Sequence, residues 1–193
     1  MSDSVPKAES KFAMSPPLLT VSSAIWPCEE DDVASITAIY GHHVLHGLAS
    51  FEIVPPSESD MRQRRLEIIG QGFPYLVAEL AGDVVGYACA SPYRLRSAYR
   101  YTVENSVYLH AAWAGRGIGG QLMSALLAEC EARGLRQIVA VSGDSANKAS
   151  IDLHQRLGFS MVGTIRSAGF KFGRWVDTVL MQRALGAGGS APP

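Results

Sequence analysis

The stretch "AGRGIGGQL" (residues 114–122) decides how the rest of this chain is interpreted. Its glycines, Gly115, Gly117 and Gly120, have the spacing G-x-G-x-x-G, and an apolar pattern of helical period follows at once. Glycine lets a backbone approach a ligand without a Cβ clash, and the N–H groups that begin a helix favour an anion. The stretch therefore predicts a phosphate-binding loop, or else a loop whose glycines serve only the turn.

The residues around the loop bear on which phosphates it would hold. A dinucleotide fingerprint needs its first glycine at the end of a strand and an acid about 20 residues further on. Asp144 lies at a tolerable distance, but residues 111–114 separate the expected strand from the glycines, and too little chain follows for a doubly wound sheet. A nucleoside triphosphate loop needs Gly-Lys-Ser/Thr, which does not occur here. The dinucleotide interpretation therefore stays open at this point, and coenzyme A is the other candidate.

Strands and helices are expected to alternate on both sides of the loop. Apolar periodicity predicts helices within residues 29–47, after Pro55 and Pro56, over 118–133 and over 147–158. Extended patterns predict strands over 75–80, 84–91, 100–110, 137–143, 160–167 and 174–183. This order indicates an α/β fold (α+β in some schemes) with a mixed sheet flanked by helices.

Composition indicates one globular domain. The chain has 193 residues, of which 47% are hydrophobic, and a net charge of −1 that gives no reason to expect nucleic acid or a membrane surface as partner. We expect a single domain over residues 21–185 between flexible tails, 1–20 and 186–193. The basic run Arg62, Arg64 and Arg65 is interpreted as a solvated helix face. The unpaired spacing of Cys28, Cys89 and Cys130 favours reduced, buried thiols in a cytoplasmic protein.

Three further stretches carry a resemblance to a known family. The segments "VENSVYLH" (103–110), "GRGIGG" (115–120) and "SANKASIDLHQRLGF" (145–159) together resemble the acetyl-CoA-binding core of the GNAT superfamily of N-acetyltransferases. With "KFGRWVD" (171–177), the chain from Ala24 to Gln182 resembles the branch that contains phosphinothricin and methionine sulfoximine acetyltransferases. The resemblance implies the GNAT fold with a mostly antiparallel mixed sheet, acetyl-CoA as co-substrate, a small-molecule amine acceptor and a homodimer.

The resemblance also implies which residues would hold the coenzyme. Backbone groups of Val107, Tyr108 and Leu109 would pair with the pantetheine arm. The pyrophosphate would lie on the loop formed by Gly115, Arg116, Gly117, Ile118, Gly119 and Gly120. Asn147 and Ser150 would contact the coenzyme, although both also fit a helix cap. One departure concerns Ala114, because the family usually has Gln or Arg there, so backbone donors would contribute more.

Glu104 and His154 are the candidate catalytic residues. In the alternating stretch 100–110, Glu104 lies on the face opposite Val103 and Val107. Acetyl transfer needs a base for an amine that is mostly protonated at pH 7, and the resemblance assigns this role to Glu104. Partial burial would have to raise its pKa. His154 stands where the superfamily has a general acid, and the alternative is a histidine packed inside a helix.

The acceptor site is expected around two segments. Arg94 and Arg96 suit a substrate carboxylate, or else belong to a solvated loop. The resemblance adds Ser97, Asn105 and Ser106 as substrate contacts and Phe51 as a pocket wall. The three histidines before it are interpreted as a helix end at the pocket rim rather than a metal site: His42, His43 and His46. A non-catalytic acyl-CoA-binding module and an acetyltransferase for a protein or antibiotic amine stay open as alternatives.

Overall fold

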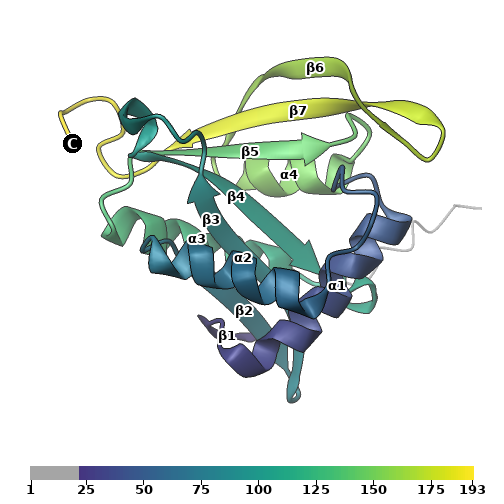
Figure 1. The fold of residues 1–193 in the computed structure, drawn as a ribbon. Helices are drawn as coiled ribbons and strands as arrows, with labels where there is room; N and C mark the ends of the chain where they lie inside the picture. Colours follow the sequence, from purple (N-terminus) through teal and green to yellow (C-terminus); the bar gives the residue numbers. More distant parts are fainter. Residues whose placement is uncertain (1–21) are drawn as a thin grey trace, which may run out of the picture.

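A seven-stranded mixed sheet forms the centre of the protein, in a computed structural model that describes residues 22–193 (Figure 1). The tail predicted for residues 1–20 lies outside the described residues. The strands follow the order β1-β2-β3-β4-β5-β7-β6. Among the described strands, β4 and β5 pair in parallel and the other neighbours are antiparallel. The α/β fold with a mostly antiparallel mixed sheet is thereby confirmed.

The helices and strands agree with the expected elements apart from a short first strand. The strands are β1 (Ala24–Pro27), β2 (Tyr75–Leu80), β3 (Asp83–Pro92), β4 (Thr102–Leu109), β5 (Gln137–Gly143), β6 (Ser160–Lys171) and β7 (Arg174–Ala184). The helices are α1 (Val33–His46), α2 (Glu58–Gly70), α3 (Ile118–Ala132) and α4 (Lys148–Arg156), with short 3-10 turns η1 (Glu30–Asp32), η2 (Ser97–Tyr99) and η3 (Ala111–Trp113). Four residues with two exposed ends give too weak a pattern for β1 to be recognised in the sequence.

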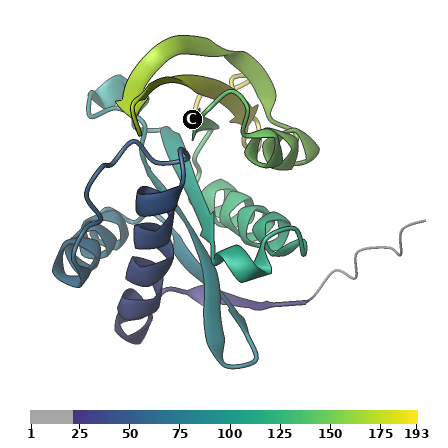
Figure 2. The same cartoon turned by 90° about the vertical axis from the view of Figure 1, so that its right-hand side faces the viewer.

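Two apolar cores lie on opposite faces of the sheet. In Figure 2, α1 and α2 cover one face and α3 covers the other. The α3 core contains Val103, Ile118 and Leu122, whereas the α1–α2 core contains Val33 and Tyr87. Strand β4 contributes to both cores because its side chains alternate between faces. The predicted alternation of residues 100–110 is thus confirmed, and it fixes which face each polar residue of β4 occupies.

The two parallel strands separate partway along their length. Strands β4 and β5 pair from Thr102↔Gln137 to Asn105↔Ala140. Beyond this last pair β4 continues to Leu109 and β5 to Gly143, and Figure 1 shows the two arrows diverging. Backbone groups on the facing edges of the divergent segments are therefore available to a ligand, since a strand edge presents unpaired N–H and C=O groups.

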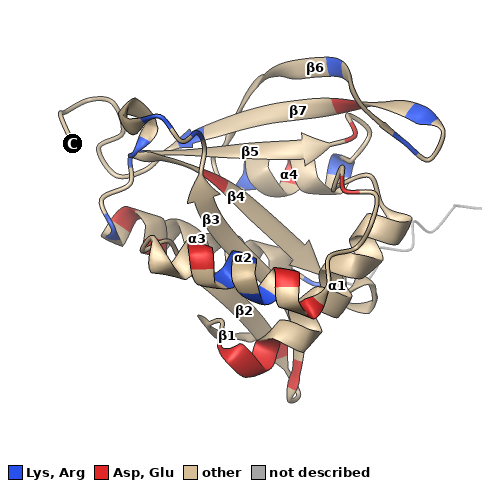
Figure 3. Ribbon diagram, in the orientation of Figure 1, with Lys and Arg blue, Asp and Glu red and all other residues tan. Residues whose placement is uncertain are grey.

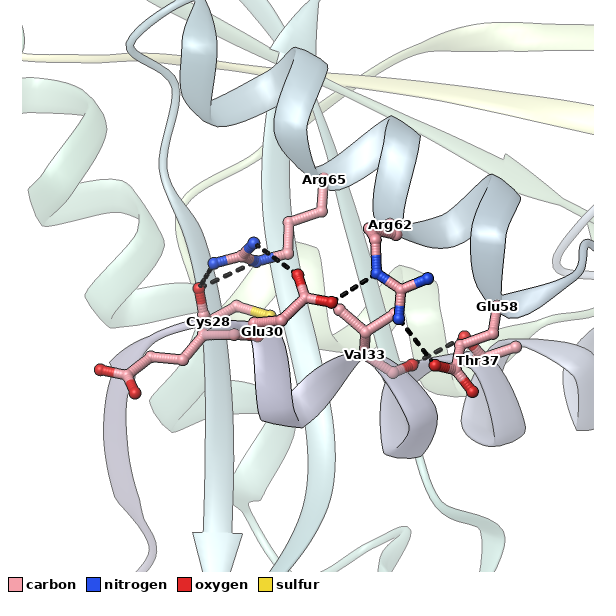
Figure 4. A network of polar contacts seen from close by, with 8 residues as sticks. Cys28, Glu30, Val33, Thr37, Glu58, Arg62 and Arg65 are labelled. Atoms are coloured by element: carbon pink, nitrogen blue, oxygen red, sulfur yellow. Dashed lines mark hydrogen bonds and ion pairs between the residues drawn. The ribbon is translucent and has the colours of Figure 1, made fainter.

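The interpretation of the basic run as a solvated face is wrong for Arg65. This side chain is buried, and its Nε and Nη2 donate to the Cys28 carbonyl at 3.0 and 2.6 Å. The neighbouring Arg62 bonds Glu30 and Glu58 and is partly exposed, so the network joins α2 to η1 and the end of β1 (Figure 4). Arg65 lies about one helical turn after the buried Met61, so both side chains face the core. The run of arginines in the sequence does not by itself reveal which member points inward.

We expect Arg65→Ala to destabilise the protein by about 2–3 kcal/mol, since it leaves a buried carbonyl without its charged donor. Urea unfolding followed by circular dichroism measures this change. Arg62→Ala is the matched control, because its ion pairs are solvent-exposed and contribute about 0–1 kcal/mol. Equal losses of stability in the two variants would contradict a special role for the buried guanidinium.

After β7 the chain forms a turn over residues 186–189 and ends without regular structure. Leu185 is fully buried, and the Arg136 guanidinium donates to the Pro192 carbonyl at 2.7 Å.

The three thiols Cys28, Cys89 and Cys130 are free and buried, as predicted. None of the helices between residues 22 and 193 is long and apolar enough to span a membrane.

Candidate active site

A narrow pocket lies where β4 and β5 separate. Its volume is about 50 Å³, and polar groups from both strands and α4 line it. The lining residues are Ala49, Asn105, Ser106, Val107, Tyr108, Ala140, Val141, Ser142, Ser150 and His154. Six of the predicted site residues are therefore brought together here. The contribution of β5 was not predicted, because nothing in "QIVAVSG" indicates where its neighbour leaves it.

The glycine loop joins the end of β4 to the start of α3. Gly117 is the N-cap of α3 with φ of +85°, a conformation that favours glycine, and it offers no side chain to cap the first N–H groups. Gly115 also has positive φ, and Arg116 is exposed with its guanidinium 4.7 Å from the Trp113 ring centre. The loop therefore presents helix N–H groups and one cation to solvent, which suits a pyrophosphate in the place predicted for it.

The residues at the start of α4 cap the helix, and they are also predicted to contact the coenzyme. Asn147 is the N-cap of α4, and its Oδ1 accepts from the Ser150 N–H at 3.2 Å. The Ser150 hydroxyl lies 3.1 Å from the Ser142 hydroxyl of β5 and lines the pocket. The cap predicted from the sequence pattern is thus present, and contact with a coenzyme stays a prediction for both residues.

His154 is deeply buried on α4, with 3% of its surface exposed. Its Nδ1 lies 2.8 Å from the Ser150 carbonyl, and its Nε2 lies 3.0 Å from the Asn105 amide nitrogen. Phe159 packs edge-on against the ring at 4.9 Å. Burial lowers the pKa of the imidazole, so the neutral form is favoured. A neutral ring that donates from Nδ1 has no proton at Nε2. To act as an acid from Nε2, the imidazole would first have to bind a second proton.

Glu104 lies on the other face of β4 from Asn105 and His154. Burial raises the pKa of its carboxyl above the ordinary value, and the nearby Arg94 guanidinium partly opposes this shift. Within residues 22–193, no hydrogen bond or ion pair holds the carboxylate. A half-buried, unbound carboxylate of raised pKa has the properties of a general base. Glu104 and His154 therefore lie on opposite faces of the sheet, near the point where β4 and β5 separate.

The thiols are poor candidates for a nucleophile. Burial raises the pKa of Cys28 to about 11 and the pKa values of Cys89 and Cys130 to about 12. All three thiols are protonated at neutral pH, and only the thiolate is strongly nucleophilic. The arrangement thus favours direct transfer over a covalent intermediate on cysteine.

The arginines proposed for substrate binding lie on the segment between β3 and β4. Arg94 stacks on Tyr93 at 4.5 Å and is near enough to Glu104 to affect its pKa. Arg96 precedes η2, which begins at Ser97, and all three residues are exposed. Figure 3 shows positive residues on this segment beside the start of β4, whereas both signs occur along α2. Arg94 is therefore the cation that the structure places with Glu104.

Phe51 belongs to a loop that packs on β5 and on the β6–β7 hairpin. A Cβ on Gly169 of β6 would lie 2.6 Å from the Phe51 ring, so glycine is needed for this close approach. Lys171, which is buried at the end of β6, donates to the Ser50 carbonyl at 2.7 Å. Sequence reasoning missed this anchor, although Lys171 is the first residue of the quoted "KFGRWVD" motif. Phe51 is 39% exposed and can form a wall beside the pocket that its neighbour Ala49 lines.

The three histidines of α1 occupy its C-terminal turns. His42 and His46 have ring centres 4.8 Å apart, while His43 Nε2 lies 2.7 Å from the Leu109 carbonyl at the end of β4. No group of three metal-ligating side chains is found within residues 22–193. Burial lowers the pKa of His43, which supports a neutral ring that donates to this carbonyl and holds the end of β4.

Comparison with known proteins places this geometry in a family. Residues 41–159 match the acetyltransferase (GNAT) family. The chain belongs to this family. It is 52% identical to a phosphinothricin N-acetyltransferase of Alcaligenes faecalis over 85% of this chain and 83% of the relative. It is 40% identical to an L-methionine sulfoximine/L-methionine sulfone acetyltransferase of Salmonella typhimurium, over 81% and 91%.

A solved structure supports the same assignment. The chain matches a GNAT superfamily phosphinothricin acetyltransferase from Sinorhizobium meliloti, crystallised with AcCoA, with a TM-score of 0.87 and 45% identity over 90% of this chain and 94% of that one. The resemblance predicted from the sequence is thus confirmed. This GNAT family member is an acetyl-CoA-dependent N-acetyltransferase, and acetyl-CoA is its co-substrate.

Proposed function

We propose that this N-acetyltransferase acetylates the amine of a small amino acid or analogue of the phosphinothricin or methionine sulfoximine type, with Glu104 as general base. The observation that carries the proposal is the placement of Glu104, a carboxylate of raised pKa, beside Arg94 and across β4 from the pocket residues Asn105 and His154. A carboxylate-bearing substrate suits the exposed arginines, since a guanidinium binds a carboxylate bidentately.

The reaction follows from this arrangement. Glu104 takes a proton from the substrate ammonium, directly or through water, and the free amine attacks the acetyl carbonyl carbon. The C–N bond forms, the nitrogen loses its second proton, and the C–S bond breaks. The electron pair leaves with the coenzyme sulfur, which takes up a proton. Backbone N–H groups of Val107, Tyr108 or Leu109 are proposed to stabilise the carbonyl oxygen as it gains negative charge. His154 is the proposed acid, in a form that carries a proton on Nε2.

The coenzyme is proposed to occupy the pocket and the loop beyond it. Its pyrophosphate would lie on residues 115–120, and its arm would run between the divergent ends of β4 and β5 near Asn147 and Ser150. Phe51, Arg94, Arg96, Ser97, Asn105 and Ser106 are proposed as acceptor-side residues. Asn105 faces α3 and His154 rather than Glu104.

A thiol-release screen tests the proposal. The protein is incubated with acetyl-CoA and methionine sulfoximine, methionine sulfone, phosphinothricin or each common amino acid, and free coenzyme A is measured. We expect release with at least one of the three analogues. Acetyl-CoA binding without release for any amine would favour a non-catalytic binding module. Release with only protein or aminoglycoside amines would favour the other alternative, although the arginines near Glu104 would repel a cationic substrate.

The protein is also proposed to act in the cytoplasm as a homodimer. Exposed apolar side chains gather on the β6–β7 hairpin, whose tip extends past the end of β5 in Figure 1. This hairpin patch consists of Met161, Val162, Ile165, Phe170, Phe172 and Trp175. An apolar surface of this kind is typical of an interface, and a second copy is the proposed partner.

Trp175→Glu tests the homodimer. Trp175 is 65% exposed and packs edge-on against Phe170 at 5.4 Å. If the hairpin patch is the interface, a buried charge there should weaken dimerisation by about 30-fold or more, as expected for an aromatic hot spot. Sedimentation velocity over a concentration series measures this. Leu66→Glu, a similar change at an exposed apolar site on α2, should leave the dimer intact, and equal dissociation in both variants would exclude the patch.

A further inference from the structure

A buried amide occupies the point where β4 and β5 separate. Asn105 is 6% exposed and forms the last β4–β5 pair with Ala140. Its side chain points to the α3 side of the sheet, where it lines the pocket with His154 and Ser150. A polar side chain this deeply buried normally has partners for both its donor and its acceptor atoms. Asn105 has partners for only one of them among the described residues.

The orientation of the amide is fixed by two acceptors. The Asn105 nitrogen lies 3.7 Å from the sulfur of Met123, which is fully buried on α3, and 3.0 Å from Nε2 of His154. A thioether has no proton to donate, so the nitrogen, not the oxygen, must face Met123. The same NH₂ group then donates to His154, and Nε2 has to be the acceptor.

The contact of the other imidazole nitrogen, Nδ1, independently indicates the same tautomer. His154 Nδ1 lies 2.8 Å from the Ser150 carbonyl, which can only accept, so Nδ1 carries the proton. The groups that contact the ring are uncharged: Asn105 of β4, Ser150 of α4 and Phe159. Within residues 22–193, the shift of the His154 pKa has no charged side chain among its causes. The ring is therefore held as the neutral Nδ1–H tautomer.

This arrangement leaves the carbonyl oxygen of Asn105 without a partner. Oδ1 is buried, and no hydrogen bond reaches it from residues 22–193. A buried acceptor without a donor is unfavourable, because it has lost its hydrogen bonds to water and gained none in the protein. The amide cannot turn over to relieve this, because Oδ1 would then face the Met123 sulfur and a Nε2 lone pair. A donor from a bound ligand in the pocket would satisfy Oδ1.

Resting on the proposed function, we propose that Asn105 is a positioning residue of the acetyl-transfer site, with two effects. Its N–H donor keeps Nε2 of His154 unprotonated, so Nε2 can bind a second proton, and then donate it, only when that bond is released. Its carbonyl oxygen accepts a hydrogen bond from an N–H or S–H group of the coenzyme arm. Asn105 thereby couples the state of His154 to occupation of the pocket.

Nitrogen-15 NMR of the histidine rings tests the first effect, with His154→Gln used to assign the signal. We expect wild-type His154 to be the neutral Nδ1–H tautomer at pH 7 and above. Asn105→Asp places an anion at Nε2, so the variant should protonate this nitrogen and raise the His154 pKa by about one unit or more. Met123→Leu, the matched control, replaces the thioether by a hydrocarbon side chain of similar size and removes neither His154 contact, so it should leave the tautomer unchanged. A wild-type Nε2–H tautomer, or an Asp variant with an unchanged His154 signal, overturns the inference.

Calorimetry with acetyl-CoA and with free coenzyme A tests the second effect, using Asn105→Leu against Met123→Leu. Loss of one hydrogen bond should weaken binding by about 3- to 10-fold. Equal weakening for both ligands identifies an amide N–H donor, and weakening for coenzyme A alone identifies the thiol. Unchanged binding of both ligands excludes a contact to Oδ1. These readouts need no acceptor amine, so they are separate from failure of the proposed substrate, which the thiol-release screen reports.

Discussion

Glu104→Gln is expected to lower kcat for acetyl transfer by about 10²–10⁴-fold while the Kd for acetyl-CoA changes by less than about twofold. Glutamine keeps the size and polarity of the side chain but cannot accept the ammonium proton. The coenzyme affinity should stay because Glu104 lies on the face of β4 opposite the pocket residues Asn105 and His154. Steady-state kinetics with excess acceptor and calorimetry with acetyl-CoA measure the two quantities.

The pH profile adds a second readout of Glu104. Burial raises the pKa of this carboxyl, and the base is active only when ionised. In the wild type, kcat/KM should therefore fall as the pH decreases through this raised pKa, with a midpoint above the ordinary value for glutamate. Glu104→Gln should lose this acid limb. Asp152→Asn, an exchange of a partly exposed carboxylate on α4 that pairs with Lys148, serves as the control and should keep the profile.

Glu104→Gln should lower activity without lowering the stability of the fold. A carboxyl whose pKa is raised by folding binds its proton more tightly in the folded state, so its contribution favours folding at low pH and is lost as the pH rises through the folded pKa. At pH 7 the ionised Glu104 therefore disfavours the folded state. Glu104→Gln should be at least as stable as the wild type at pH 7. A variant with full activity would remove Glu104 from the role of base, whereas an unfolded variant would contradict this account of its burial.

The strand face that Glu104 occupies was predictable because it depends on local periodicity, whereas the catalytic roles predicted for Glu104 and His154 came from the family resemblance. Alternation along β4 separates Glu104 from Val103 whatever the strand pairs with, and this separation is confirmed. The glycine loop was recognisable for a similar reason. Gly117 has a positive φ, which favours glycine, and it stands directly before the first residue of α3. Each of these features is determined within a segment of about ten residues, so a single sequence contains the required information.

The remaining features of the site depend on contacts between distant segments. The pocket exists because β4 and β5 stop pairing at Asn105↔Ala140, and the sequence of neither strand specifies that register. Lys171 reaches the Ser50 carbonyl across 121 residues, and Arg65 reaches the Cys28 carbonyl across 37. Sequence periodicity gives the face of an element but not its partner. For this reason a charged residue such as Arg65 was assigned to solvent when it is buried.

Gly117→Val is expected to weaken acetyl-CoA binding by about 100-fold, the largest effect predicted for the coenzyme loop. Gly117 has φ of +85° at the N-cap of α3, and a β-branched residue is strongly disfavoured there. Relief of this strain requires the backbone of residues 115–118 to change. The N–H groups that begin α3 would then no longer converge on one anion, and a loss of about 3 kcal/mol corresponds to this factor.

The opposite end of the same helix supplies the control. Gly134 follows α3 with φ of +74°, and a Cβ there would meet open space, so Gly134→Val introduces comparable backbone strain without touching the loop. Both variants should lose stability in urea unfolding by similar amounts, but only Gly117→Val should lose affinity for acetyl-CoA in calorimetry. Equal affinities in the two variants would show that the coenzyme does not depend on the N-terminus of α3. The predicted phosphate-binding role of residues 115–120 would then have to be abandoned, whatever acceptor the protein acetylates.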